Sequence, residues 1–237
     1  MIAFNLSREI DTERLAACYH STGRVVIEPF LDPDSASTLA QHLASRTDWR
    51  LVLNGGDKVF EIGRNEFDAL PASERARIDA AVVESGRAGF QYRYDTVRVS
   101  DDPENRARRD DPIDRFAAWM AAPATLDPLR AIIGSPDVDF ADAQATAYRS
   151  GDFLNAHDDD VAGKGRRAAY VLGLTPDWRP EWGGLLLFHD GCRVEGIVPG
   201  YNRLTFFRVP QVHSVSYVAP LAPRPRYSFT GWLRKLG

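Results

Sequence analysis

From Asp137 onward the chain consists of short β-rich runs separated by turn residues, and this pattern restricts the class of fold that it can adopt. The runs are VDFADAQATAYRS (138–150), RRAAYVLGL (166–174), GGLLLFH (183–189), CRVEGIV (192–198), NRLTFFRV (202–209), HSVSYV (213–218) and RYSFTGWL (226–233). Many short strands at close spacing are typical of a closed or double-sheet β architecture. Asp190-Gly191 predicts a tight hairpin turn between two of these runs, and Pro199-Gly200 marks another turn.

The residues before Asp137 alternate helices with a few strands. Capping residues, early prolines and terminal glycines predict helices over 11–20, 32–45, 71–86, 113–122 and 126–134, and apolar patterning predicts strands over 24–31 and 91–99. Between them, the segment 100–112 carries many charges and no apolar side chain larger than that of Ala107. It cannot be ordered by apolar burial, so the sequence predicts a mobile loop there.

The chain shows no internal repeat, no low-complexity tract and no clear linker. We therefore expect a single domain over 1–237, of the α+β class with a mainly β core. Residues 1–136 would form a helical support layer with a few strands, and residues 137–237 a β-barrel-like core that carries the site. A chain of 237 residues is long enough to bury such a core without disulfides or a structural metal.

Charge and cysteine content exclude several protein classes. The 29 basic and 33 acidic side chains leave a formal net charge of −4, which argues against a polybasic nucleic-acid binder. Cys18 and Cys192 are too few for a disulfide framework or a four-cysteine zinc site, so a reducing cytoplasm is the simplest location. No run approaches the roughly 20 apolar residues of a membrane span, and charged residues such as Arg8 interrupt the start. We expect a cytoplasmic protein with no membrane or nucleic-acid partner.

One short motif and one distant histidine could bind a metal. In FLNAHDDD, His157 and Asp159 are two residues apart, so an extended backbone would place both side chains on one face. His213 opens a later strand-like run that a β-barrel could bring across to this pair. Two histidines and a carboxylate suit non-haem Fe(II), because they leave positions open for other ligands. The same set also binds catalytic zinc, but the chain lacks HExxH, which favours iron.

The C-terminal run RPRYSFTGWLRK could bind an acidic ligand. Arg226, Ser228 and Thr230 alternate and would share one face of a strand. An arginine presents a planar fork that pairs bidentately with a carboxylate, and the hydroxyls beside it can donate further hydrogen bonds. On this run alone, an ordinary surface-facing arginine stays an open alternative.

Taken together, these residues resemble a known family. The ordered set comprises Tyr148, His157-x-Asp159, Trp178 followed by Gly183-Gly184, His213-x-Val215, and Arg226 through Trp232. It resembles the Fe(II)- and 2-oxoglutarate-dependent dioxygenases of the prolyl 4-hydroxylase type, over about the last hundred residues. The resemblance implies that the β core is a double-stranded β-helix, or jelly-roll.

The resemblance also implies roles for individual side chains. His157, Asp159 and His213 match the iron ligands, and Arg226 matches the basic residue that binds the distal carboxylate of 2-oxoglutarate. These four would form the catalytic set. Tyr148, Val215, Thr230 and Ser228 fall where such enzymes contact or enclose the cosubstrate.

Two features depart from the family pattern. A Glu often follows the Gly-Gly pair, where this chain has Leu185, and the stretch PLAPRP lengthens the interval before the basic residue. The longer interval leaves a choice between Arg224 and Arg226. We expect Arg226 to act, because RYSFTGW keeps the family register, whereas Arg224 lies between two prolines that hinder strand pairing.

The activity implied by the resemblance is hydroxylation of a C–H bond, coupled to decarboxylation of 2-oxoglutarate to succinate and CO₂. Fe(II), 2-oxoglutarate and O₂ would be required, with ascorbate as a reductant. A prolyl residue of a protein or peptide is the first expected substrate, and Asp159 favours hydroxylation over halogenation. A free amino acid or small metabolite is the alternative substrate, and a non-catalytic metal-binding or ligand-binding β-barrel module is the alternative function. The sequence leaves the substrate, the oligomeric state, the role of the N-terminal half and a lid function of 100–112 open.

Overall fold

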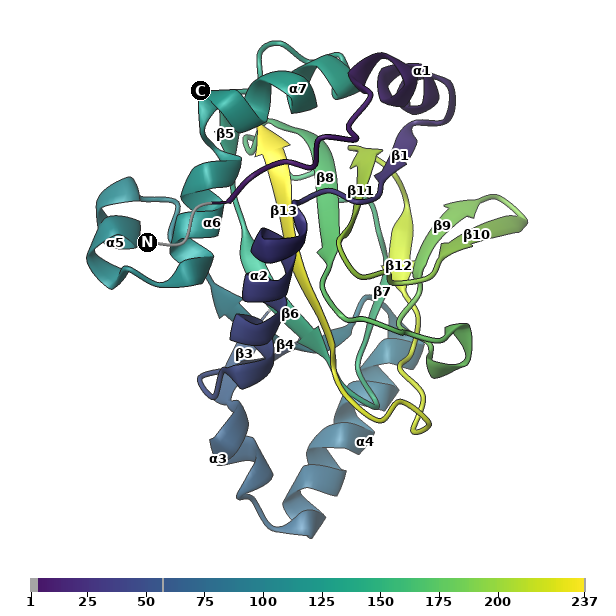
Figure 1. Ribbon diagram of the computed structural model, residues 1–237. Coiled ribbons are helices and arrows are strands. Elements are labelled where there is room, and N and C mark those ends of the chain that lie inside the picture. The colour runs from purple at the N-terminus through teal and green to yellow at the C-terminus, as the bar shows by residue number, and fades with distance from the viewer. Residues whose placement is uncertain (1–3, 57, 237) are drawn as a thin grey trace.

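The computed structural model describes residues 4–56 and 58–236, and its strands form one curled antiparallel sheet. The strands are β1 (Arg24–Ile27), β2 (Arg50–Gly55), β3 (Lys58–Gly63), β4 (Tyr92–Arg98), β5 (Phe140–Ala141), β6 (Gln144–Tyr148), β7 (Phe153–His157), β8 (Arg166–Gly173), β9 (Leu186–Asp190), β10 (Arg193–Ile197), β11 (Arg203–Arg208), β12 (His213–Val215) and β13 (Arg226–Arg234). Figure 1 shows the sheet curling into a half-barrel. The expected α+β fold with a mainly β core is confirmed.

The strand order explains the curl. It runs β1-β11-β8-β13-β6-β4-β7-β12-β9-β10, with β2 and β3 extending from β4 and β5 pairing with β13. The two end strands, β1 and β10, are joined by an ion pair between Arg24 and Glu195. The Arg24 guanidinium also lies 4.8 Å from the ring centre of Phe188, so apolar contact supports the pair.

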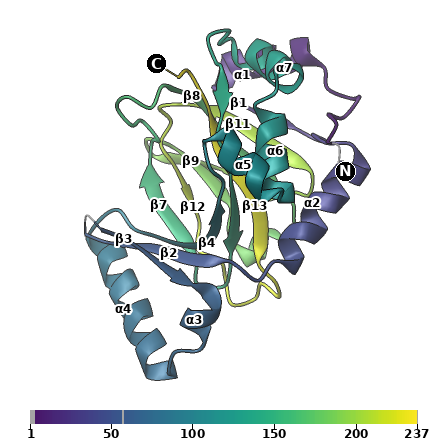
Figure 2. The same cartoon turned by 90° about the vertical axis from the view of Figure 1, so that its left-hand side faces the viewer.

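Helices cover the outer face of the sheet and share the main core with it. The helices α1 (Thr12–Thr22), α2 (Pro33–Ser45), α6 (Pro112–Met120) and α7 (Pro123–Ile133) lie on the same side of the sheet, as Figure 2 shows. The side chains of Asp11, Asp32 and Asp111 accept backbone N–H bonds at the starts of α1, α2 and α6. Fully buried side chains such as Leu39, Phe116 and Phe229 join the helices to the sheet.

A second, smaller unit had not been predicted from the sequence. The β2–β3 hairpin packs with α3 (Arg64–Asp68) and α4 (Ala72–Ala88) around a separate core of Leu51, Leu53, Phe67 and Val82. Only the helix 71–86 was expected here. The missed signal is Asn54-Gly55-Gly56 between two apolar runs, where Gly56 has φ +60°. Because β2 pairs with β4, this unit attaches directly to the main sheet.

The prediction of a mobile loop over 100–112 is wrong. Residues Pro103–Arg109 form α5, whose start is capped by the Asp102 carboxylate. Arg106 is buried, with its guanidinium 5.7 Å from the Phe140 ring centre. Capping and arginine packing therefore order a segment that has no large apolar side chain of its own.

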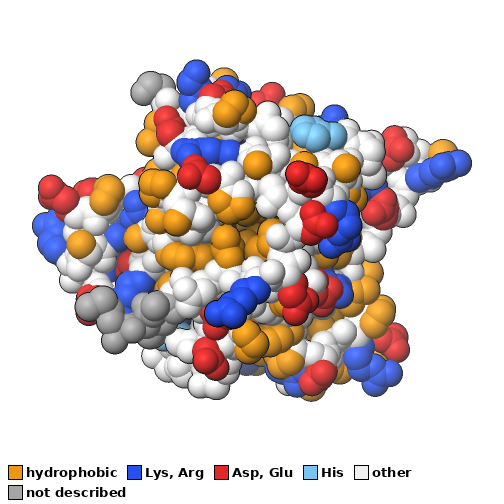
Figure 3. Space-filling model, turned by 45° about the horizontal axis from the view of Figure 1, so that its top comes forward, with side chains coloured by type: hydrophobic (Ala, Val, Ile, Leu, Met, Phe, Trp, Pro, Cys, Tyr) orange, Lys and Arg blue, Asp and Glu red, His pale blue; other side chains and the backbone are white. Residues whose placement is uncertain are grey.

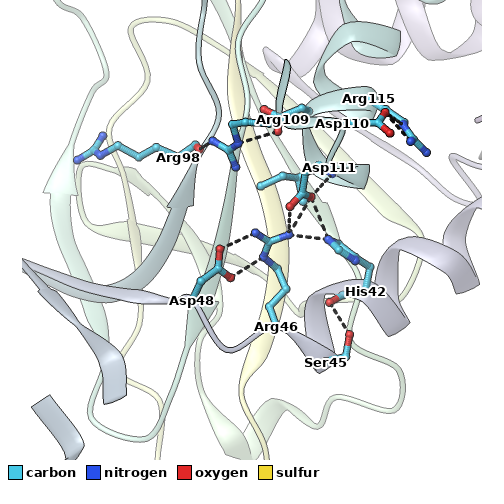
Figure 4. Close-up of polar contacts among 11 residues, drawn as sticks. His42, Ser45, Arg46, Asp48, Arg98, Arg109, Asp110, Asp111 and Arg115 are labelled. Atoms are coloured by element: carbon cyan, nitrogen blue, oxygen red, sulfur yellow. Dashed lines mark hydrogen bonds and ion pairs between the residues drawn. The ribbon is translucent and has the colours of Figure 1, made fainter. Parts of the chain in front are cut away.

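Ion pairs also fasten this segment to α2. Figure 4 shows the Arg46 side chain between Asp48 and Asp111, with nitrogen–oxygen distances of 2.7 Å to each. The His42 ring lies 3.0 Å from the same Asp111 carboxylate. Burial alone would raise the pKa of Asp111, but the hydrogen bonds from Arg46 and from the Ile113 N–H lower it. The link between α5 and α6 is thus held to the end of α2.

The hairpin between β9 and β10 forms, but its turn is one residue later than predicted. Asp190 pairs with Arg193, so the two turn residues are Gly191 and Cys192 rather than Asp190 and Gly191. Gly191 has φ +56°, whereas Cys192 does not have a positive φ. A two-residue turn with positive φ only at its first position favours glycine there, which explains the shift.

Acidic and basic side chains are mixed on the molecular surface. Figure 3 shows both kinds across one face, around a hollow where hydrophobic side chains gather. This mixture agrees with the nearly balanced charge of the chain. Among the described residues, no helix combines the length and the apolar character needed to span a membrane.

A buried ion network fixes the turn between β6 and β7. Asp152 is fully buried, accepts the Arg149 N–H at 2.7 Å and lies 3.5 Å from Nε of Arg93. Backbone hydrogen bonds of Gly151 and Asp152 join the same turn to Val218. Burial raises the pKa of Asp152 to about 7, although the Arg93 guanidinium opposes this.

We expect Asp152 to contribute a fall in the free energy of unfolding as the pH rises from about 4 to about 7. Over this range the unfolded chain releases the Asp152 proton while the folded chain keeps it, so the folded state loses stability with increasing pH. One proton contributes a slope of at most about 1.4 kcal/mol per pH unit. The free energy of unfolding, measured with urea across this pH range, should fall less steeply with pH for Asp152→Asn than for the wild type. Equal slopes for the two proteins would contradict the prediction.

Candidate metal centre

Two histidines and one aspartate meet at the open ends of two paired strands. His157 ends β7, His213 begins β12, and the two residues are direct partners in the ladder. Asp159 follows β7 and faces the Nε2 edges of both rings, with its carboxylate oxygens 3.5 Å from Nε2 of His157 and 3.4 Å from Nε2 of His213. Their ligand atoms all lie within 4.8 Å of one another. The residues singled out as metal ligands are therefore together, although His213 arrives on a neighbouring strand rather than from across the barrel.

Backbone carbonyls set the orientation of both imidazoles. Nδ1 of His157 lies 3.0 Å from the carbonyl oxygen of Asn155, and Nδ1 of His213 lies 2.8 Å from that of Gln211. A neutral imidazole that donates from Nδ1 keeps the lone pair on Nε2. Both rings therefore present an acceptor nitrogen to the space beside Asp159, as metal ligation requires.

The protonation states also suit a cation. Burial lowers the pKa of His213 to about 4, and the neighbouring His157 adds to this effect. For His157, burial would lower the pKa, but hydrogen bonding to Asp159 outweighs it and raises the pKa. The pKa of Asp159 is lowered because its bond to His157 and the charge of His213 outweigh burial. The cluster thus offers an ionised carboxylate beside a neutral imidazole.

The cluster opens into a cavity of about 350 Å³ that also contains Arg226. The Arg226 side chain is buried, and its Nε and Nη1 atoms have no hydrogen-bond partner. Burial lowers its pKa, and the guanidinium carbon lies 5.2 Å from the ring centre of Tyr148. A buried guanidinium without partners is costly, so an anionic ligand in this cavity would be stabilised by pairing with Arg226.

Two glycines allow the wall beside Arg226 to close. Gly183 and Gly184 follow a short 3-10 helix, Pro180–Trp182, and have φ +70° and φ +65°. A Cβ atom on Gly183 would lie 2.0 Å from the carbonyl oxygen of Tyr217. The backbone can therefore approach this closely only without a side chain, which accounts for the Gly-Gly pair.

The two candidate arginines have different surroundings. Arg226 pairs with Tyr148 across β13 and β6 and lines the cavity. Arg224 is exposed, donates to the carbonyl oxygen of Pro176, and lies over the Trp182 ring. The structure thus places Arg226, and not Arg224, where a ligand of the cavity could reach it.

Most of the other residues singled out in the sequence line the same cavity. Tyr148, Val215 and Thr230 do so. Ser228 is fully buried, but its hydroxyl lies 2.8 Å from that of Thr146, and Thr146 rather than Ser228 lines the cavity. Ser228 therefore reaches the site only through Thr146.

Sequence reasoning missed an aromatic wall. Tyr92 and Tyr94 of β4 line the cavity, and the Tyr94 ring stacks on Tyr148 with centroids 5.2 Å apart. Phe90 extends this row and lies 5.7 Å from the His157 ring. The alternation in QYRYDTVRV gave the strand but not its place beside the site, because pairing between β4 and β6 is a long-range contact. Arg166 and Trp232 also line the cavity.

The donor set fits a ferrous ion and a dicarboxylate. Two imidazole nitrogens and one carboxylate from one side suit Fe(II) with further positions open. The unpaired Arg226 guanidinium in the same cavity suits the far carboxylate of a short diacid such as 2-oxoglutarate. Asp159, His157 and His213 would hold the ion, while Arg226 and Tyr148 would hold the diacid.

Comparison with protein families agrees with this site. Residues 143–234 match the model described as the 2OG-Fe(II) oxygenase superfamily. The chain is 32% identical over 161 residues to prolyl 3-hydroxylase OGFOD1 of Mus musculus, covering 60% of this chain and 27% of that protein. It is 36% identical over 100 residues to the Xenopus laevis protein of the same name, and the match covers 38% of this chain and 19% of that protein. The chain thus spans only about a fifth to a quarter of the length of these relatives.

Solved structures share the fold. A prolyl-4-hydroxylase from Pseudomonas putida superimposes with a TM-score of 0.60 at 20% identity, covering 96% of this chain and 100% of that one. A prolyl hydroxylase from Trichoplax adhaerens, in complex with a peptide fragment of the hypoxia inducible factor oxygen degradation domain, has a TM-score of 0.58 at 14% identity, with 94% and 89% covered. The half-barrel is therefore the double-stranded β-helix expected from the sequence.

Proposed function

We propose that this chain, which carries a 2OG-Fe(II) oxygenase domain of the prolyl hydroxylase type, hydroxylates a prolyl residue of a protein or peptide. The observation that carries the proposal is the unpaired, buried Arg226 guanidinium in the same cavity as the His157, Asp159 and His213 cluster. A site for a metal alone would not need this second, anion-binding feature.

Each side chain would have a defined task. His157, Asp159 and His213 would hold Fe(II), and the Nδ1 bonds of both histidines would keep their Nε2 atoms directed at it. Arg226 would pair with the far carboxylate of 2-oxoglutarate, and Tyr148 would pack beside it. When bound, Fe(II) with 2-oxoglutarate and O₂ supplies hydroxylation of a C–H bond coupled to release of succinate and CO₂. The protein contributes orientation and a cavity that restricts water.

The aromatic wall supports a prolyl substrate. Phe90 is half-exposed, while Tyr92 and Tyr94 are partly exposed along the same cavity wall. Aromatic faces of this kind pack well against an aliphatic ring that carries little charge. The names of the curated relatives and the peptide in the Trichoplax adhaerens structure point to the same class of substrate.

Mass spectrometry of proteins after incubation with the chain, Fe(II), ascorbate and 2-oxoglutarate tests this proposal. We expect a gain of one oxygen atom on a prolyl residue, together with an equal amount of succinate, and neither product with Asp159→Ala. Binding of Fe(II) and 2-oxoglutarate without succinate would instead identify a non-catalytic module. Oxygen found only on a free amino acid or metabolite would overturn the choice of substrate.

We also propose that the protein is located in the cytoplasm. Cys18 and Cys192 are both exposed, and neither forms a disulfide. Free exposed thiols are typical of a reducing compartment. A ferrous site also keeps its oxidation state more readily there.

A further inference from the structure

Asp159 has an unusual backbone conformation. Its φ is +64°, in the left-handed region that residues other than glycine seldom adopt. Aspartate tolerates this region better than most residues, but the conformation still requires support from its surroundings. The support must come from contacts that fix both the backbone and the carboxylate of this one residue.

Arg166 makes contacts of this kind. Its Nη1 atom donates to the Asp159 carbonyl oxygen at 2.9 Å and lies 3.7 Å from the carboxylate oxygen Oδ1. One guanidinium therefore contacts both the backbone and the side chain of residue 159. The Arg166 side chain is only 15% exposed, so water screens these contacts weakly.

The Arg166 guanidinium is itself held in place from its other side. Its central carbon lies 3.5 Å from the ring centre of Trp232, which pairs with Ala169 across β13 and β8. A guanidinium stacked on an indole has little freedom to rotate. Arg166 is thus fixed relative to the sheet, and its contacts fix Asp159 relative to the sheet in turn.

The loop between the two residues brings the chain back for this contact. Gly163 and Gly165 have φ +78° and φ +59°, and a Cβ atom on Gly165 would lie 2.1 Å from the carbonyl oxygen of Lys235. A backbone hydrogen bond from the Lys235 N–H to the Gly165 carbonyl oxygen closes the loop against the end of β13. Arg166 can therefore begin β8 directly beside the residue that follows β7.

Burial makes packing alone a poor explanation for an arginine here. Nε of Arg166 is buried without a partner, and burial lowers the pKa of the guanidinium. An apolar side chain of similar length would fill the space without this penalty. The next residue offers a contrast, because Arg167 is 40% exposed and pairs with Asp137 at 2.7 Å.

We propose that Arg166 is a positioning residue for Asp159, which holds the left-handed backbone and turns the carboxylate toward the two imidazoles. The inference rests on the proposed metal centre and extends it to a residue outside the ligand set. Its consequence is that the site is arranged for a divalent cation before the cation binds. Without Arg166, the divalent cation could bind only after Asp159 had been brought into its ligating conformation.

Titration with Mn(II), in the absence of 2-oxoglutarate and O₂, tests this role without turnover. The free ion is measured by electron paramagnetic resonance for the wild type, Arg166→Met, Arg166→Lys and the control Arg167→Met. We expect Arg166→Met to weaken Mn(II) binding about 10- to 100-fold, as for other residues that orient metal ligands. Arg166→Lys should lie between it and the wild type, and Arg167→Met should be within about twofold of the wild type.

Thermal unfolding separates positioning from folding. Arg166→Lys keeps a positive charge and a long aliphatic side chain. If Arg166→Met does not fold, the Mn(II) affinity of Arg166→Lys therefore tests the role of Arg166. Folded Arg166 variants that bind Mn(II) as tightly as Arg167→Met would overturn the role of Arg166 while leaving the metal centre intact. A wild-type protein that does not bind Mn(II) would overturn the metal centre itself, and the role of Arg166 with it.

Discussion

Replacement of His157 by alanine should abolish turnover of 2-oxoglutarate to succinate. The variant keeps His213 and Asp159 but loses one of three ligand atoms that lie within 4.8 Å of one another. Loss of a direct ligand should weaken Fe(II) binding by more than the roughly 100-fold cost of losing an outer partner. Succinate production at limiting Fe(II) is the measurement, and we expect a rate at background.

A histidine outside the cavity supplies the control for this result. His42 lies on α2 and contacts Asp111 and Arg46 rather than the cavity. His42→Ala should leave the Fe(II) dependence of turnover unchanged. Wild-type turnover by His157→Ala at limiting Fe(II) would show that this histidine is not a ligand.

Replacement of Arg226 by methionine should raise the KM for 2-oxoglutarate by about 100- to 5,000-fold. A buried ion pair that loses one partner costs about 3–5 kcal/mol, because the remaining charge is left without compensation. Methionine keeps much of the length and the apolar stem, so the wall formed with Tyr148 and Gly184 should persist. The dependence of the succinate rate on 2-oxoglutarate gives the KM.

The matched control is Arg224→Met, which removes an exposed arginine only two residues away. Its KM for 2-oxoglutarate should stay within about twofold of the wild type. Mn(II) binding without 2-oxoglutarate should be unchanged in both variants, since neither residue contacts the metal cluster. A large effect of Arg224→Met with none of Arg226→Met would show that Arg224, and not Arg226, binds 2-oxoglutarate.

The parts of the fold that follow local patterns were predictable. Alternation in RYSFTGW indicated that Arg226 and Thr230 share a face, and both line the cavity. The spacing of His157 and Asp159 indicated a shared site, but the extended backbone expected between them is wrong, because β7 ends at His157 and Asp159 has φ +64°. Short β runs after Asp137 gave the mainly β core, because strand periodicity and turn residues are local properties.

The features that depend on long-range contacts were not predictable. Nothing near Tyr92 or Tyr94 indicates that β4 pairs with β6 and so brings them to the cavity. The charged segment over 100–112 is ordered by Arg46 and Phe140, which lie far away in the sequence. The assignment of residues 1–237 to one domain stays a prediction.

The direct pairing of His157 with His213 has a consequence for folding. The ladder between β7 and β12 sets the separation of the two rings, with ring centroids 4.2 Å apart. A slip of one residue in this ladder would send one imidazole to the opposite side of the sheet. Refolding intermediates with a shifted register would then be unable to bind the ion through both histidines. The time at which metal binding appears during refolding would therefore report when β7 and β12 reach their native register.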